Sequence, residues 1–119
     1  MSTPSAFPVE AFRQAIESRD VQALVGLYAD DAVFQMIDRR NPPSRPGELR
    51  GKAAIRAMYE DVCGRAMTHR VEDTLQDGDK LAYTETCEYP DGTRVFVAGI
   101  ANLKDGRIER QVNLQAWDE

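Results

Sequence analysis

The sequence predicts an α+β fold, in which N-terminal helices pack on one face of a strongly curved antiparallel sheet. Apolar residues recur at helical spacing in the first half of the chain and alternate with polar residues in the second half. Three short links in the second half, DGD, PDGT and KDG, each carry an Asp-Gly pair suited to tight hairpins. Helices followed by strands are typical of α+β domains. The 119 residues are expected to form one domain, residues 1–119.

Two helices are expected near the N-terminus. Val9, Phe12 and Ile16 recur at helical spacing within residues 8–19. Asp20 then suits the N-cap of a second, short helix, because its side chain can accept a hydrogen bond from a free backbone N–H. The acid pair Asp30-Asp31 is expected to end that helix.

A strand and an irregular segment are expected next. Residues 32–38 are predicted to be extended, so Phe34, Met36 and Asp38 share one face. Residues 38–51 contain three prolines and two glycines and are predicted to be irregular.

A third helix and four strands complete the predicted elements. The helix is expected to run from Gly51 to Gly64, a natural C-terminal stop. Its buried stripe consists of Ala54, Ile55, Met58, Tyr59 and Val62. The strands are predicted at residues 68–76, 80–89, 94–103 and 107–117, and their short links require an antiparallel meander.

Composition narrows the function classes. A net charge of −5 disfavours nucleic acid as a partner, because nucleic-acid binding requires a basic surface. No apolar run approaches the ~18 residues of a membrane span, and the N-terminal MSTPSAFPVEAF does not have the pattern of a secretory signal. Four arginines gather in the irregular segment, where a solvated loop is favoured over a phosphate cradle: Arg39, Arg40, Arg45 and Arg50.

The two cysteines bear on location and cofactors. Cys63 and Cys87 form neither a disulfide framework nor a metal-ligand spacing. They are predicted to be reduced thiols of a cytoplasmic protein. Neither a metal nor another cofactor is expected.

Several segments together carry a family resemblance. The chain resembles the nuclear transport factor 2-like superfamily in four successive segments. These are AFRQAIESRDVQALVGLYADDAVF, a proline-rich loop, LRGKAAIRAMYEDV and DGRIERQVNLQAWD. Within it the sequence is most similar to SnoaL-like and ketosteroid-isomerase-like proteins, and YADDA is the most specific element. The resemblance implies a cone-shaped, cystatin-like fold, a pocket between helices and sheet, and a homodimer formed through the outer sheet face.

The catalytic groups of ketosteroid isomerase are not found at the matching positions. Aligned on YADD, the general base of that family falls on Met36, the oxyanion-hole tyrosine on Phe12, and the protonated acid on Gly99. Losing one such acid or base costs ~10²–10⁴ in rate, so steroid isomerisation by that mechanism is excluded. Tyr28 and Tyr59 match two supporting tyrosines of the family and are interpreted as structural.

The last predicted strand carries a row of amides. The sequence also resembles limonene-epoxide hydrolase, which has an Asp on its last strand. The matching position here is Asn113, and because an amide cannot deprotonate water, that charged group is absent. Gln111, Asn113 and Gln115 share one strand face and are predicted to point into the pocket, whereas the competing register turns them to water. The opposite face is apolar and is expected to meet a dimer partner: Val112, Leu114 and Ala116.

Asp38 and His69 are the candidate catalytic residues. Asp38 follows Met36 on one strand face and would then lie at the pocket mouth; the alternative is a loop-edge carboxylate in water. His69 is the only histidine, and imidazole is a side chain suited to proton transfer; the alternative is ordinary packing or solvent exposure. Glu88 is a minor base candidate, and Trp117 could cap either the pocket or a dimer seam.

The predicted function is small-molecule binding in an apolar pocket lined by neutral polar groups. The reaction expected is that of an isomerase, cyclase or hydratase acting on a polyketide- or steroid-like compound; the alternative is a non-catalytic dimeric interaction or ligand-sensing module. The expected partners are an apolar or amphipathic ligand and a second copy of the chain, without nucleic acid or membrane. The predicted binding residues are Phe12, Ile16, Tyr28, Met36, Met58, Tyr59, Val97, Gly99, Gln111, Asn113 and Gln115.

Overall fold

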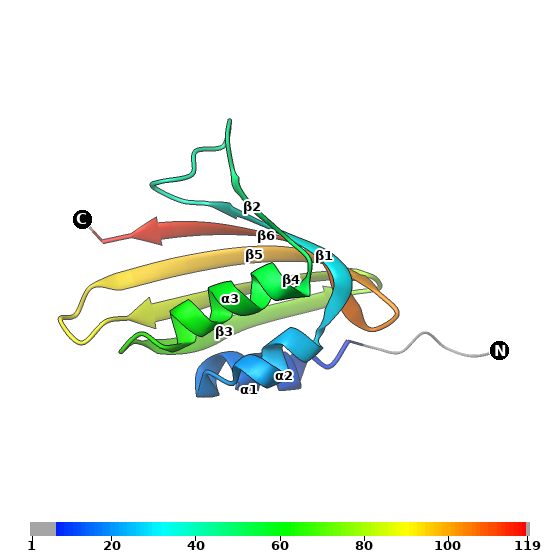
Figure 1. Cartoon of the computed structure of the whole chain (residues 1–119). Coiled ribbons are helices and arrows are strands. Elements are labelled where there is room, and N and C mark those ends of the chain that lie inside the picture. The colour runs from blue at the N-terminus through cyan, green and yellow to red at the C-terminus, as the bar shows by residue number, and fades with distance from the viewer. Residues whose placement is uncertain (1–6, 119) are drawn as a thin grey trace.

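A computed structural model describes residues 7–118 and shows three helices on one side of a curved six-stranded sheet (Figure 1). Both ends of the predicted domain, and part of the N-terminal segment tested for a secretory signal, lie outside the described residues. The helices are α1 (Val9–Ser18), α2 (Val21–Gly26) and α3 (Lys52–Cys63). The strands are β1 (Tyr28–Ile37), β2 (Gly47–Arg50), β3 (Thr68–Asp77), β4 (Lys80–Glu88), β5 (Arg94–Lys104) and β6 (Arg107–Trp117).

The sheet order is β2-β1-β6-β5-β4-β3. Strands β3 to β6 form the predicted antiparallel meander, and Gly78, Gly92 and Gly106 in its three links all have positive φ. Strand β1, by contrast, pairs parallel to β6, with Met36 opposite Asn113. The sheet is therefore mixed rather than wholly antiparallel, because short links determine only the pairing of consecutive strands.

Strand β1 begins earlier than the sequence suggested. It starts at Tyr28 and continues through the acid pair, which does not form a corner. The register against β6 shifts between Tyr28 and Val33, which marks a bulge, and Asp30 and Asp31 are exposed there. The bulge in β1 thus accommodates Asp30 and Asp31, the two acids that were expected to end the preceding helix.

The segment expected to be irregular is shorter than predicted. Residues 47–50 form β2, which pairs antiparallel with β1 and places Leu49 opposite Phe34. The prolines at 42, 43 and 46 all precede β2. They fall where no ladder hydrogen bond is needed, as expected for a residue without an N–H.

The helices form largely as predicted. The side chain of Asp20 accepts a hydrogen bond from the backbone N–H of Ala23 at 3.1 Å, which confirms it as the N-cap of α2. Ile55 and Tyr59 are buried on α3, and the rest of its predicted stripe is half-buried. Helix α2 ends at Gly26, four residues before the acid pair that was expected to end it.

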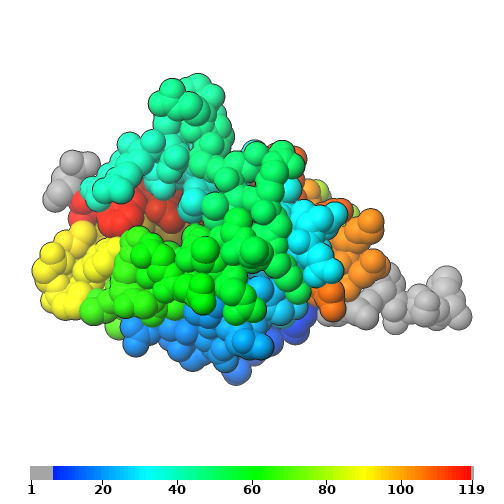
Figure 2. Space-filling view, viewed as in Figure 1, coloured from blue at the N-terminus to red at the C-terminus, as the bar shows by residue number. Residues whose placement is uncertain are grey.

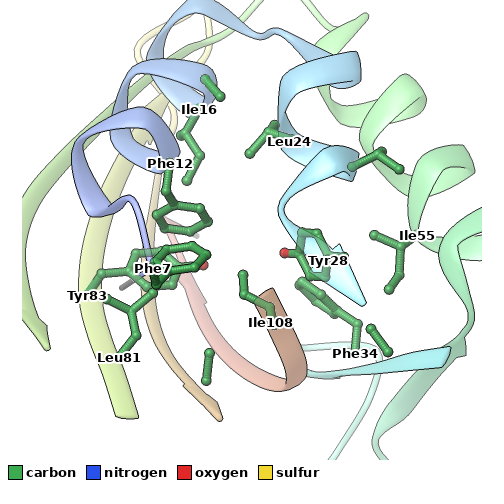
Figure 3. Close-up of a cluster of buried hydrophobic side chains, with 14 of the residues drawn as sticks. Phe7, Phe12, Ile16, Leu24, Tyr28, Phe34, Ile55, Leu81, Tyr83 and Ile108 are labelled. Carbon is green, nitrogen blue, oxygen red and sulfur yellow. The ribbon is translucent and has the colours of Figure 1, made fainter. Parts of the chain in front are cut away.

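The main core lies between the helices and the concave face of the sheet (Figure 3). Phe12 of α1 is fully buried, and its ring meets that of Tyr83 edge-on with the ring centroids 5.1 Å apart. Tyr28 and Ile108, which are register partners on β1 and β6, are also fully buried. Figure 3 shows these side chains converging from both layers, so the core fixes the helices over the sheet.

The opposite face of the sheet carries exposed apolar side chains on β5 and β6. Phe96, Ile100 and Leu114 are 46%, 61% and 53% exposed. Strands β5 and β6 place Leu114 opposite Ala98, and Ile100 opposite Val112, so these side chains lie on one contiguous surface.

None of the helices formed by residues 7–118 is both long and apolar enough to cross a membrane.

Candidate functional site

A cavity of about 110 Å³ lies between the helices and the sheet. Figure 2 shows the face on which α3 covers the sheet, with β6 visible beside it. Side chains from all three helices and from five strands line the cavity: β1, β3, β4, β5 and β6. Eight of the predicted site residues line the cavity: Ile16, Met36, Met58, Tyr59, His69, Val97, Asn113 and Gln115.

Four other predicted binding residues do not line the cavity. Phe12 and Tyr28 are fully buried in the core, and Gln111 is fully buried in a hydrogen-bond network beneath the cavity wall. Gly99 lies opposite Tyr83 in the β4–β5 pair, and the ring of Tyr83 covers it. These residues shape the wall from behind and are not placed to contact a ligand in this structure.

Asp38 is not at the pocket mouth, contrary to the prediction. Its Oδ1 accepts hydrogen bonds from the backbone N–H groups of Arg40 and Asn41 and from Asn41 Nδ2, each at 2.9 Å. A short carboxylate at a turn commonly bonds to the backbone just beyond it. Asp38 therefore closes its own turn, and the geometric basis for a catalytic role is lost.

Glu88, the minor base candidate, is exposed at the end of β4, where its Oε1 lies 3.1 Å from Arg94 Nε. A solvent-exposed pair of this kind contributes little energy. Glu88 is not among the cavity-lining residues.

Three buried polar side chains meet on the β3–β4 part of the cavity wall. His69 Nδ1 lies 2.9 Å from Glu85 Oε2 and 3.3 Å from Cys87 Sγ, and the Cys87 thiol donates to Glu85 Oε2 at 3.1 Å. His69 is the register partner of Cys87, and Glu85 shares the inward face of β4 with Cys87. The cavity wall therefore carries a carboxyl group, which was not predicted, as well as the predicted His69 and neutral amides.

The hydrogen bonds of this cluster define the role of each histidine nitrogen. The tautomer that satisfies both contacts of Glu85 Oε2 has the ring hydrogen on His69 Nδ1, which then donates to the same carboxylate oxygen that accepts from the Cys87 thiol. His69 Nε2 is then the nitrogen left for other partners. It is the one buried side-chain nitrogen or oxygen without a hydrogen-bond partner among the described residues. Leaving such an atom unpaired costs about 1–3 kcal/mol, which calls for an explanation.

Glu85 was missed because Glu88, on the opposite face of β4, was the only acid of this strand considered as a base. The alternation Leu81, Tyr83, Glu85, Cys87 is the buried row, and Glu85 is the single acid within it. A carboxyl group in an otherwise apolar or aromatic strand face is a recognisable signal. A buried ionisable group is costly unless it is paired.

A second network of neutral groups lies beside this cluster. Tyr59 Oη lies 2.6 Å from Tyr28 Oη, which donates to Gln111 Oε1 at 2.5 Å. Gln111 Nε2 and Asn113 Nδ2 then donate to Tyr83 Oη at 2.8 and 3.0 Å. The inward register of Gln111 and Asn113, which are buried, is confirmed. The network holds Asn113 rigidly at the cavity surface.

The three tyrosines predict a loss of stability in alkali. Burial raises the pKa of Tyr28, Tyr59 and Tyr83 well above the ordinary 10.0. The unfolded chain therefore releases these protons first, and stability falls as the pH rises above 10.0, by up to about 1.4 kcal/mol per pH unit for each tyrosine. Urea unfolding at a series of pH values measures this slope. Tyr28→Phe should reduce the slope by one tyrosine's share, and an unchanged slope would contradict the assignment.

Aromatic residues form one end of the cavity. The rings of Tyr89 and Trp117 stack with their centroids 6.1 Å apart, and the Arg39 guanidinium carbon lies 4.4 Å above the Trp117 ring. Arg65 Nη1 donates to Tyr89 Oη at 3.0 Å. Trp117 lines the cavity, and through its contact with Arg39 it also packs against the loop that follows β1.

Comparisons with known proteins agree with this architecture. The family model for the SnoaL-like domain matches residues 9–111. No curated protein sequence matches the chain at a significant level. Among solved structures, an NTF2-like protein of unknown function from Mesorhizobium loti is 20% identical with a TM-score of 0.77, and the match covers 91% of this chain and 87% of that one.

Two further structures carry functional names. A candidate ketosteroid isomerase from Kribbella flavida is 17% identical with a TM-score of 0.76, covering 93% of this chain and 75% of that one. A candidate polyketide cyclase from Sinorhizobium meliloti is 23% identical with a TM-score of 0.67, covering 88% and 91%. At such identities the likeness shows the fold alone. Together with the family match over most of its length, the architecture shows that this chain belongs to the SnoaL-like domain family and has the NTF2-like, cystatin-like fold.

Proposed function

We propose that the protein is a small-molecule enzyme of the isomerase, cyclase or hydratase type, in which His69 and Glu85 form the proton-transfer pair. The observation that carries the proposal is the buried, unpartnered Nε2 of a histidine that lines the cavity. The carboxyl group on Nδ1 orients the ring, as expected for a general base held by a second group. Perturbed or unpaired polar groups in a cavity are a recognised indicator of function.

The chemistry begins with proton removal by His69 Nε2. The proton of an acidic C–H or O–H group of the substrate moves to Nε2, and the electron pair moves toward the carbonyl oxygen or leaving group. Glu85 stabilises the imidazolium that forms, and His69 later returns the proton to another atom. Asn113 uses one N–H on Tyr83 and has a second N–H to donate to a substrate oxygen.

The proposed ligand is amphipathic, with a carbonyl or hydroxyl group near His69. Apart from the polar cluster and the amides, the cavity wall is largely apolar, with thioethers from Met36, Met58 and Met67. Unbranched thioethers adapt to ligands of irregular shape. Polyketide- or steroid-like compounds combine these properties, which is why we retain them as the substrate class.

Proton exchange with solvent tests this function directly. The protein would be incubated in D₂O with a panel of enolisable ketones and dehydratable alcohols, and deuterium incorporation followed by proton NMR. Incorporation above the buffer rate supports the proposal. Binding of a panel member without exchange would favour the alternative, a ligand-sensing module, and neither binding nor exchange across the panel would contradict both.

We also propose a homodimer formed through the outer face of β5 and β6, where Phe96, Ile100 and Leu114 are exposed. Leu114→Glu combined with Ile100→Glu is expected to shift the chain to monomer in sedimentation analysis, because buried like charges oppose association. Ala57→Glu, on the exposed side of α3, is the matched control and should leave the mass unchanged. A wild-type chain that sediments as a monomer would contradict the proposal.

A cytoplasmic location, based on the free thiols of Cys63 and Cys87, stays a prediction.

A further inference from the structure

We propose that His69, Glu85 and Cys87 form a binding site for a thiophilic divalent cation such as Zn²⁺. The three residues offer one nitrogen, one oxygen and one sulfur atom, all within 4.8 Å of one another, and all three side chains are buried. This donor set suits Zn²⁺ and Co²⁺ rather than Mg²⁺ or Ca²⁺, which prefer oxygen ligands.

The triangle of ligand atoms is close to one face of a tetrahedron. With metal–ligand distances of ~2.0 Å for nitrogen and oxygen and ~2.3 Å for sulfur, tetrahedral ligands lie roughly 3.3–3.6 Å apart. The observed separations are 2.9 Å from Nδ1 to Oε2, 3.3 Å from Nδ1 to Sγ, and 3.1 Å from Sγ to Oε2. An ion therefore needs each separation to grow by at most roughly 0.4 Å, which small side-chain rotations can supply.

Charge also favours the ion. In the absence of metal, the Cys87 thiol donates to Glu85. Metal binding would release this thiol proton to solvent and shift the ring hydrogen from Nδ1 to Nε2, so that Sγ and Nδ1 both bind the cation. One thiolate and one carboxylate neutralise a divalent ion within a buried site. All three residues line the cavity, so a fourth ligand can reach the ion from there.

The inference does not depend on the proposed enzymatic function, because metal binding is measured without substrate. A bound ion would take Nδ1 and Glu85 out of the proton-transfer pair. The metal-bound and proton-transferring forms are then alternative states of one cluster. Failure of either proposal leaves the other open to its own test.

Cobalt spectroscopy provides the test. The full chain, freed of metals with a chelator, would be titrated with Co²⁺ under reducing conditions. We expect saturation at one equivalent with a thiolate-to-cobalt charge-transfer band, and loss of the band on addition of Zn²⁺. Cys87→Ser should abolish the band. Cys63→Ser is the matched control, because Cys63 is the other free thiol that lines the cavity, and it should retain the band.

Two results would overturn the inference. One is the absence of a charge-transfer band in the wild-type chain; the other is a band that survives in Cys87→Ser and is lost in Cys63→Ser. Circular dichroism establishes whether each variant is folded. Should Cys87→Ser fail to fold, His69→Gln retains both thiols and is expected to weaken Co²⁺ affinity by at least about tenfold, since a ligand contributes no less than its supporting groups; unchanged affinity would refute the site.

Discussion

Replacing His69 with glutamine is expected to lower enzyme-dependent deuterium exchange by about 10²–10⁴-fold. Glutamine can still hydrogen-bond to Glu85, but it cannot accept a proton near neutral pH. Glu85→Gln should act in the same direction, because an amide does not stabilise the imidazolium that forms on His69. The rate is measured with whichever panel compound the wild-type chain exchanges fastest.

Asp38→Asn is the matched control for these variants. The Asp38 carboxylate bonds to Arg40 and Asn41 and does not line the cavity, so the exchange rate should remain close to that of the wild type. Loss of exchange in Asp38→Asn together with full exchange in His69→Gln would reverse the assignment of the proton-transfer group.

Gly99→Ala is expected to destabilise the fold by roughly 1–3 kcal/mol, an effect typical of overpacking. A Cβ at this position would lie 2.4 Å from Tyr83 Cε1 and 2.6 Å from Asn113 Oδ1, closer than non-bonded atoms approach. Because Tyr83 and Asn113 are hydrogen-bonded to each other and to Gln111, neither can move without disturbing the network. The free energy of unfolding in urea measures the effect.

Gly26→Ala is the control for this substitution. A Cβ at Gly26, the last residue of α2, meets no atom within 4 Å, so this change should be neutral or stabilising by up to about 1 kcal/mol. Equal stability of the two alanine variants would show that the wall at Gly99 is looser than the structure indicates. The same crowding explains why the position matched to the acid of ketosteroid isomerase holds a glycine, since the Tyr83 ring fills the space in front of it.

Local sequence signals predicted most of the fold. The Asp-Gly links indicated the meander, and Asp20 and the α3 stripe indicated helices, because each depends on residues close together in the chain. The parallel pairing of β1 with β6 and the pairing of β2 with β1 could not be derived in this way. These strand pairings join segments that are far apart in the sequence, so they depend on how the whole domain packs and not on local residue patterns.

The candidate site was only partly predictable. The sequence correctly indicated that Met36 would face the pocket and that Gln111 and Asn113 would point inward, because strand alternation determines both. It missed the partners of His69, since only the β3–β4 register brings the ring to Glu85 and Cys87. Positions matched to known catalytic residues contain no ionisable group, whereas the ionisable pair lies on two other strands.

Nitrogen-15 NMR of the imidazole tests the central claim most directly, because His69 is the only histidine in the chain and its signals need no assignment by mutation. The long-range proton–nitrogen spectrum of the chain freed of metals, recorded at neutral pH, is predicted to show a protonated Nδ1 and an unprotonated Nε2, with the Nε2 shift changing when a ligand binds. An imidazole with its proton on Nε2 and a bare Nδ1 would contradict the account, because Glu85 would then not hold the ring as a base toward the cavity.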